Sequence, residues 1–247
     1  MADASEYRER RSSVEGITVW TRVADGPSLI LPDGCIDVLW DGSQLSVAGP
    51  DTTAHVASPA TGTRYTALRF ESGVAPTVLG VSADGLRDER LALADVVGAE
   101  EADRLAESLL AHADPSGALE RWAGRRLASA GGRDLTMRRV AGLLRDGRPV
   151  AEVASAMGFS QRHLNRRALA SFGYGPKVLA RVLRLGRALE WVRAGVPLVE
   201  VAINAGYGDQ AHFAHEVRAL TGRTATHFVG SGANRSTPLP SGSRNVA

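Results

Sequence analysis

The sequence predicts an α+β protein of two domains. The first is a small β-barrel or sandwich with flanking helices, and the second is an all-α domain of two similar two-helix units joined by a long helix. Three observations predict this class. Short apolar runs separated by turns occupy residues 17–70, helical periodicity follows from about residue 75, and a two-helix pattern occurs twice after residue 132.

Five short apolar runs between residues 17 and 70 have the length of strands. They are Ile17–Trp20, Leu29–Leu31, Cys35–Trp40, Leu45–Ala48 and Tyr65–Phe70. Glycine, proline and aspartate lie between them, and these residues supply turn geometry. Asp41-Gly42 is a candidate for a two-residue hairpin turn. Strands at this spacing favour a small barrel or sandwich over βαβ units.

Helical patterning occupies residues 75–130. An apolar stripe in this region includes Leu105, Leu109 and Leu110. The stripe has two interpretations: it forms a contact in a homodimer, or it packs against the strands of its own chain. The sequence leaves both open.

The domain boundary is placed at Gly131-Gly132, which forms a flexible joint. The predicted domains are residues 1–132 and residues 133–230. The tail, residues 231–247, is rich in serine, glycine and proline, which predicts disorder.

The net charge of +2 conceals a strong asymmetry between the two halves. Residues 1–132 carry 12 arginines and 20 acidic residues, a balance of −8, whereas residues 133–247 carry 17 basic and 7 acidic residues, a balance of +10. Such an asymmetry points to a polyanionic partner for the basic half, although a solvated basic face is the simpler alternative. Arginine, which supplies 16 of the 17 basic residues, suits phosphate and guanine recognition.

Composition also excludes several classes of protein. No run approaches the ~18 apolar residues that span a bilayer, so no membrane partner is expected. The single cysteine, Cys35, excludes an intrachain disulfide framework and a zinc site built on several cysteines. The charged first residues lack the apolar core of a secretory signal. We therefore expect a cytoplasmic protein.

The basic half contains an internal repeat. The first copy spans Ala151–Gly173 and the second spans Val199–Gly222. In each, a short amphipathic helix ends at a glycine, an aromatic residue follows, and a helix-capping residue comes next: Gly158, Phe159 and Ser160 in the first copy, and Gly206, Tyr207 and Asp209 in the second. Helix, tight turn and helix in this order predict two helix-turn-helix units.

A long helix is predicted between the two copies. Pro176 suits a first helical turn, and Gly195 with Pro197 ends the helical pattern. The 19 residues from Pro176 to Ala194 would span roughly 28 Å. Helices that read successive major grooves lie about 34–36 Å apart, so this connector supplies most of the required separation without a dimer.

Residues 136–228 resemble the DNA-binding domain of AraC-type regulators. The resemblance is carried by Ala-x-x-x-Gly-Phe-Ser-x-x-His-Leu at 154–164, by Gly-x-x-Pro at 173–176, and by Ala-x-x-x-Gly-Tyr ahead of the segment 209–213. It implies a bacterial, nucleoid-associated transcription regulator whose two units enter adjacent major grooves of double-stranded DNA. RNA polymerase is a further partner that the resemblance leaves open. Neither enzymatic activity nor a cofactor is expected.

Base-contacting residues are expected in the first turns of the second helix of each unit. In the first unit these are Gln161, Arg162, Asn165 and Arg166, of which the resemblance also indicates the last three. Arginine can bind guanine through two hydrogen bonds and asparagine can bind adenine in the same way. In the second unit they are Gln210, Ala211 and His215. The imidazole of His215 stands where the family usually has arginine, so the second unit is expected to contribute less.

Phosphate contacts are expected from Arg167, Lys177, Arg181 and Arg218, with a solvated surface charge as the alternative for each. His163 and His212 lie in the first helical turns and are interpreted as structural or as DNA-backbone contacts, and not as catalytic residues.

The acidic half resembles an uncharacterised domain that precedes AraC-type DNA-binding domains, notably in residues 31–40 and 48–52. The resemblance implies a sensory or dimerising role. A small-molecule effector could lie in an apolar pocket lined by Trp20, Trp40 and Phe70 with Arg69 as its polar group, although ordinary core packing explains the aromatic residues as well.

Two alternative functions stay open. A metal-dependent enzyme would need a cluster of His and carboxylate ligands, and only His55 lies in the strand region. A DNA-binding protein without sequence preference would share the basic repeat but would not discriminate among sites.

Overall fold

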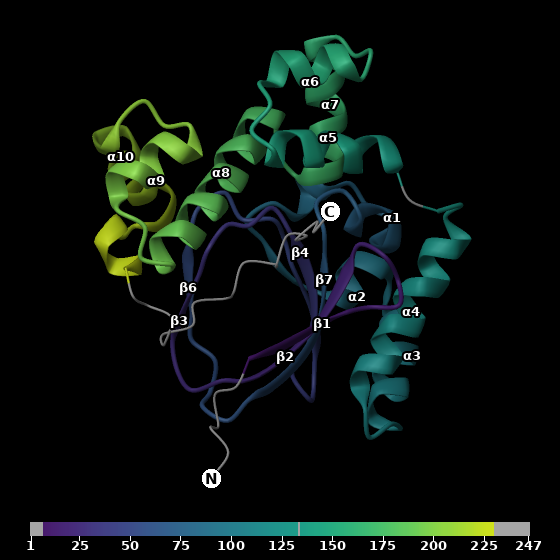
Figure 1. The fold of residues 1–247 in the computed structure, drawn as a ribbon. Coiled ribbons are helices and arrows are strands. Elements are labelled where there is room, and N and C mark those ends of the chain that lie inside the picture. The colour runs from purple at the N-terminus through teal and green to yellow at the C-terminus, as the bar shows by residue number, and fades with distance from the viewer. Residues whose placement is uncertain (1–6, 133, 230–247) are drawn as a thin grey trace.

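The computed structural model describes residues 7–132 and 134–229. In Figure 1 a sheet-rich N-terminal half lies beside a C-terminal half made of helices. The predicted fold class is therefore confirmed. The tail predicted to be disordered, residues 231–247, lies outside the described residues.

The N-terminal half contains two antiparallel sheets. The larger one has the order β1-β2-β7-β4-β5-β8, and β3 pairs with β6 in a two-stranded sheet. The strands are β1 (Arg8–Arg11), β2 (Ile17–Val23), β3 (Ser28–Ile30), β4 (Ile36–Trp40), β5 (Leu45–Ala48), β6 (His55–Ala57), β7 (Arg64–Phe70) and β8 (Arg90–Ala92). The five predicted strands are present, whereas β1, β6 and β8 were not predicted.

The hairpin between β4 and β5 differs from its prediction. Trp40 pairs with Leu45, so the loop has four residues and not two. The Asp41 carboxylate organises this loop by accepting hydrogen bonds from the Ser43 and Gln44 amides at 2.8 and 2.7 Å. A side-chain acceptor that captures two loop amides favours the longer turn.

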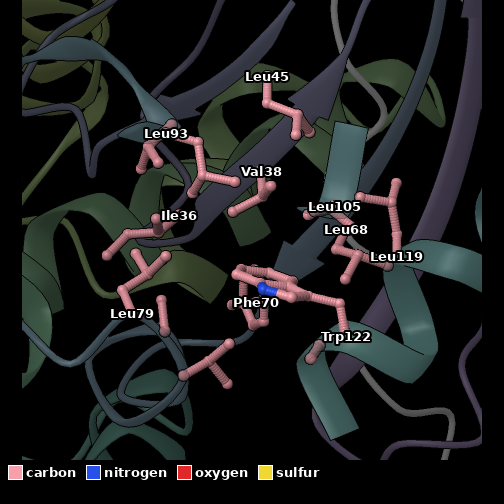
Figure 2. Close-up of a cluster of buried hydrophobic side chains, with 14 of the residues drawn as sticks. Ile36, Val38, Leu45, Leu68, Phe70, Leu79, Leu93, Leu105, Leu119 and Trp122 are labelled. Carbon is pink, nitrogen blue, oxygen red and sulfur yellow. The ribbon is translucent and has the colours of Figure 1, made fainter. Parts of the chain in front are cut away.

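Helices cover one face of the larger sheet. They are α1 (Ala75–Leu79), η1 (Ala83–Leu86), α2 (Leu93–Val97), α3 (Ala99–Leu110) and α4 (Pro115–Ser129). Figure 2 shows Leu105, Leu119 and Trp122 from these helices against Leu68 and Phe70 of the sheet.

The stripe on α3 packs within its own chain. Leu105 and Leu109 are buried in the core beneath the sheet, and Leu110 is 72% exposed. A homodimer contact that uses Leu105 and Leu109 is therefore contradicted, because these side chains are already covered.

The C-terminal half consists of helices throughout its described part. They are α5 (Leu135–Arg145), α6 (Val150–Ala156), α7 (Gln161–Phe172), α8 (Pro176–Arg193), α9 (Leu198–Ala205), α10 (Gln210–Thr221) and η2 (Ala225–Phe228). In Figure 1, α8 runs from the group α5–α7 to the group α9–α10. In the described ranges no helix combines the length and the apolar character that a bilayer crossing needs.

The two halves pack closely at the end of α7. Gly173 has φ of +82°, and a Cβ atom there would lie 2.5 Å from Pro50 Cγ and 2.9 Å from the Ala83 carbonyl oxygen. Arg87 Nη1 donates a hydrogen bond to the Gly173 carbonyl at 3.2 Å. Only glycine fits this contact, because it combines a left-handed backbone with no side chain.

A second contact joins the two-stranded sheet to α8–α10. The Ala54 amide donates to the Leu220 carbonyl at 2.7 Å. Leu31, which is 4% exposed, lies in the same core cluster as Leu185 and Val217. The N-terminal half thus contacts both two-helix units. The domain boundary at residue 132 stays a prediction, and apolar packing crosses it.

Candidate nucleic-acid interface

The first two-helix unit consists of α6, α7 and the turn between them. Gly158 has φ of +66°, a left-handed conformation that glycine adopts at little cost. The Phe159 amide then donates to the Ala154 carbonyl at 2.8 Å. The Ser160 hydroxyl accepts from the His163 amide at 3.2 Å and caps α7. The predicted turn and cap are both present.

The second unit repeats this geometry in α9 and α10. Gly206 has φ of +78°, and the Tyr207 amide donates to the Ala202 carbonyl at 2.9 Å. The Asp209 carboxylate caps α10 by accepting from the His212 amide at 2.7 Å. The sequence repeat is therefore a structural repeat, in which two reading helices, α7 and α10, begin in the same way.

His163 and His212 each pack against the aromatic residue in the turn of their own unit. The His163 ring stacks on the Phe159 ring with centroids 4.7 Å apart, and the His212 ring meets the Tyr207 ring edge-on at 5.4 Å. His212 Nδ1 also accepts from the Gly208 amide at 3.1 Å. These contacts agree with the structural role expected for both side chains.

The outer face of α7 holds the predicted base-contacting residues of the first unit. All four are exposed: Gln161, Arg162, Asn165 and Arg166. Leu164 and Ala168 are buried on the opposite face of the helix. A Cβ atom at Gly175 would lie 2.7 Å from Asn165 Oδ1, so the Asn165 amide rests against the chain that leads into α8.

The outer face of α10 is arranged in the same way. Gln210, Ala211 and His215 are exposed, whereas Phe213 and Val217 are buried. Val217 fills the position that Ala168 fills in the first unit, and both are fully covered. The structure thus presents both predicted reading surfaces to solvent.

The four predicted phosphate-contacting residues fall into two groups. Lys177 and Arg218 are exposed, and neither forms an ion pair with another described residue. Arg167 pairs with Asp134, and Arg181 pairs with Glu216. The second group is therefore already bound to carboxylates within the protein.

The Arg181–Glu216 pair is bidentate. Arg181 Nε and Nη2 donate to the two carboxylate oxygens at 2.8 and 3.0 Å. These hydrogen bonds hold the pKa of Glu216 below its usual value, an effect that outweighs the partial burial of the carboxylate. Glu216 is therefore ionised at neutral pH and attracts the guanidinium.

The connector α8 joins the cores of the two units. It begins at Pro176 and ends at Arg193, which confirms the predicted long helix. Its 18 residues span roughly 27 Å. Leu179 and Leu183 lie in the core of the first unit, and Leu185 and Leu189 lie in that of the second.

The four residues of the predicted effector pocket do not share one site. Trp40 and Phe70 lie in the core beneath the helices. Trp20 and Arg69 lie on the other face of the sheet, where the Arg69 guanidinium is 5.9 Å from the Trp20 ring centroid. Neighbouring residues on a strand point to opposite faces, which separates Arg69 from Phe70.

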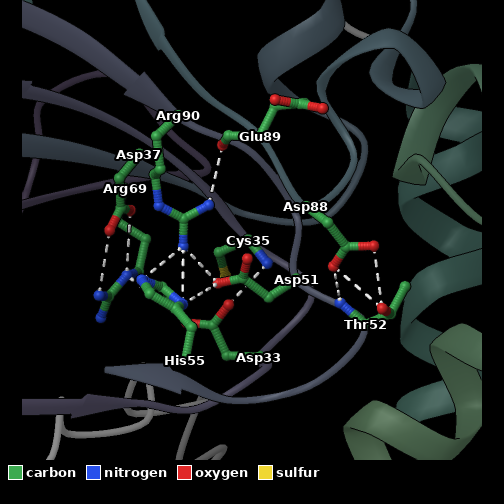
Figure 3. A network of polar contacts seen from close by, with 10 residues as sticks. All are labelled: Asp33, Cys35, Asp37, Asp51, Thr52, His55, Arg69, Asp88, Glu89 and Arg90. Atoms are coloured by element: carbon green, nitrogen blue, oxygen red, sulfur yellow. Dashed lines mark hydrogen bonds and ion pairs between the residues drawn. The ribbon is translucent and has the colours of Figure 1, made fainter. Parts of the chain in front are cut away.

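Arg69 belongs to a buried charge network instead. It is 3% exposed, and its Nε and Nη2 each donate to the Asp37 carboxylate at 3.2 Å, as Figure 3 shows. Asp33 Oδ2 lies 3.7 Å from Arg69 Nε. Burial raises the pKa of Asp37 despite the nearby guanidinium, because desolvation disfavours the carboxylate. The contacts of Arg69 are those of a structural ion pair.

Sequence reasoning missed a second polar cluster beside this one. Arg90 Nη2 donates to Asp51 Oδ2 at 2.7 Å and lies 3.1 Å from His55 Nδ1 (Figure 3). The three residues come from β8, from the loop after β5 and from β6. Their pairing depends on contacts between distant segments, for which the sequence carries no local signal. No group of three His, Cys, Asp or Glu side chains in residues 7–132 and 134–229 is arranged to hold a metal ion.

The repeat has the geometry of two helix-turn-helix units, and the second helix of the first unit, α7, carries three arginines and no acidic residue. Residues 153–230 match the family model of the helix-turn-helix domain named HTH_18. Residues 153–230 therefore form an AraC-type helix-turn-helix domain, the kind of domain through which transcription regulators bind DNA. The match covers α7–α10 together with most of α6.

Solved structures of two other proteins resemble this chain distantly. A structure of ToxT from Vibrio cholerae is 12% identical over 92% of this chain and 98% of that chain, with a TM-score of 0.43. ToxT of strain SCE256, solved with a bound unsaturated fatty acid, is 9% identical over 89% and 96% of the chains, with a TM-score of 0.45. A probable AraC family transcriptional regulator from Rhodopseudomonas palustris is 22% identical over 40% of this chain and 97% of that chain, with a TM-score of 0.35. No curated protein gives a significant match.

Proposed function

We propose that the protein recognises a specific double-stranded DNA sequence by inserting α7 and α10 into successive major grooves, and that it regulates transcription from that site. One observation carries this proposal: two capped reading helices of the same build present exposed polar faces and are joined by a single continuous helix. In such units the first turns of the reading helix contact base edges.

The first unit supplies most of the sequence discrimination. Arg162 and Arg166 are one helical turn apart on the exposed face of α7, and Asn165 lies beside them. Two arginines favour guanines, whereas an asparagine favours adenine.

The second unit reads with shorter groups. Gln210 can bind adenine, and the Ala211 methyl group can pack against a thymine methyl. His215 offers one ring nitrogen where an arginine would offer a fork of two donors. The half-site beneath α10 should therefore be less sharply defined than the one beneath α7.

Phosphate contacts are best assigned to the exposed cations. Lys177 stands in the first turn of α8, and Arg218 stands in the last turn of α10. RNA polymerase contact, nucleoid association, homodimer formation and a small-molecule effector stay predictions, and the dispersal of the proposed pocket residues gives an effector no defined site among them.

Selection of bound sequences from random double-stranded DNA by the purified full-length chain tests the proposal. The expected product is an enriched site with two segments whose centres lie about 10–10.5 base pairs apart. Retention of DNA without any enriched sequence would instead support the alternative of nonspecific binding. Absence of binding at low ionic strength would contradict both.

Arg166→Ala should weaken binding to the selected site by about 1–3 kcal/mol and relax the preference at one base pair, because a two-donor contact to a base is lost. Titrations on the selected site and on its single-base variants measure both effects. Arg148→Ala is the matched control, because Arg148 is exposed in the same domain but lies before α6 and pairs with Glu152. An unchanged base preference in Arg166→Ala would show that Arg166 does not contact bases.

A further inference from the structure

Arg167 and Glu216 occupy the same position in the two reading helices. Each stands four residues after the histidine, His163 or His212, whose amide donates to the helix cap. The charges at this position are opposite. In each unit, however, this side chain forms an ion pair with the helix that precedes the unit. The partner is the capping residue of that helix in the first unit and a residue within the helix in the second.

In the first unit the partner is Asp134. Its carboxylate caps α5 by accepting from the Thr136 and Met137 amides at 3.0 and 3.1 Å, and it also pairs with Arg167. The Arg167 guanidinium lies over the Phe159 ring, 5.2 Å from its centroid. The side chain therefore ties α7 to the start of α5 and to the turn of its own unit.

In the second unit the partner is Arg181 of α8. Glu216 is 9% exposed, and it accepts both hydrogen bonds of the Arg181 fork. Arg184 Nη2 lies 3.8 Å from the same carboxylate, and the Arg184 guanidinium lies 4.4 Å from the Tyr207 ring centroid. Two arginines of α8 thus hold both the turn and the reading helix.

We propose that Arg167–Asp134 and Glu216–Arg181 are equivalent anchors of reversed polarity that fix each reading helix against its supporting helix. In this proposal, which rests on the proposed function, Arg167, Arg181 and Glu216 are positioning residues for base reading, and Arg167 and Arg181 do not contact phosphate. A bidentate pair restrains orientation as well as distance, because both donors of the guanidinium plane must meet both carboxylate oxygens.

The second anchor matters most for the spacing of the two reading helices. Arg181 lies on the connector, so its pair with Glu216 sets how α10 leaves α8. Loss of the Arg181–Glu216 pair should impair recognition of the DNA segment that α10 contacts, while recognition of the segment that α7 contacts should remain. A phosphate contact would behave differently, because its loss weakens binding uniformly across sequences.

Exchanging the charges of Arg181 and Glu216 distinguishes a positioning role of Arg181 from a phosphate contact. Arg181→Glu and Glu216→Arg, each alone, should bind the selected site at least about tenfold more weakly than wild type and should lose footprint protection over the segment beneath α10. The double variant restores an ion pair with the polarity of the first unit, and should bind within about threefold of wild type with protection regained. Double-variant binding as weak as that of Arg181→Glu would overturn the proposal in favour of a phosphate contact, and wild-type behaviour of both single variants would also overturn it.

Arg181→Lys provides a second test that keeps the positive charge. Lysine still binds phosphate as a point charge but loses the planar fork. The anchor predicts reduced protection beneath α10 in this variant, whereas a phosphate contact predicts an unchanged footprint. Arg148→Lys is the control, since Arg148 is exposed, pairs with Glu152 at the surface and is assigned no contact with DNA.

Thermal unfolding of the wild type, the two single charge variants and the double variant is measured in parallel. Nonadditive changes in Tm, with the double variant closer to wild type, are expected for an anchor and require no DNA. If the wild type selects no site, the proposed function fails, while this cycle still decides whether the anchor exists. Additive changes in Tm would overturn the anchor even if the wild type binds a specific site.

Discussion

Gly49→Ala should destabilise the protein by about 3 kcal/mol or more, because an added methyl group meets backbone atoms that cannot move aside. A Cβ atom at Gly49 would lie 1.5 Å from the Leu86 carbonyl oxygen and 2.6 Å from the Leu86 carbonyl carbon. The Gly49 amide also donates to the Glu89 carbonyl at 3.0 Å, which holds the two segments together. Thermal unfolding should show a Tm lower by roughly 10 °C.

Gly85→Ala is the matched control for this substitution. Gly85 lies in η1, one residue before Leu86, and a Cβ atom there has no neighbour within 4 Å. The control should unfold close to the wild-type temperature. Equal stability of Gly49→Ala and Gly85→Ala would contradict the close approach of β5 to η1.

Arg69→Met should cost about 3 kcal/mol of stability, because it leaves the largely buried Asp37 carboxylate without its cation. Arg69 donates twice to Asp37 and lies 3.7 Å from Asp33. Methionine keeps much of the side-chain volume, so the loss measures the charge more than the packing. Unfolding in urea, monitored by far-UV circular dichroism, gives the change directly.

Arg104→Met serves as the control, because Arg104 pairs with Glu100 at the surface and such exposed pairs contribute about 0–1 kcal/mol. The double variant Arg69→Met with Asp37→Asn should recover part of the lost stability, since a neutral amide replaces the unpaired carboxylate. A fully stable Arg69→Met variant would show that Arg69 is not structural and would return it to the role of a ligand-binding group.

The two reading units were predictable because their signals are local. Gly158, Phe159 and Ser160 set the turn and the cap within three consecutive residues, and the second copy repeats the pattern with one extra residue, Gly208. Such signals depend on backbone conformation and on side chains a few residues apart, which sequence order specifies directly.

The sheet was predicted only in part. β1 has the sequence Arg-Glu-Arg-Arg, and its strand form comes from pairing with β2 at the sheet edge and not from apolar alternation.

The predicted effector pocket was inconsistent with the alternation of side chains along a strand. Arg69 and Phe70 are consecutive residues of a strand, so they face opposite sides and cannot line the same pocket wall.

The sequence by itself determined the two-helix repeat, the connector between its copies and the charge asymmetry of the halves. Only the tertiary structure decided which arginines already have carboxylate partners, and that Leu31 completes the core of a unit formed more than 150 residues later. The physical reason is the range of the interactions. Helix caps and turns form between near neighbours, whereas ion pairs and core packing depend on which distant segments the fold brings within a few ångströms.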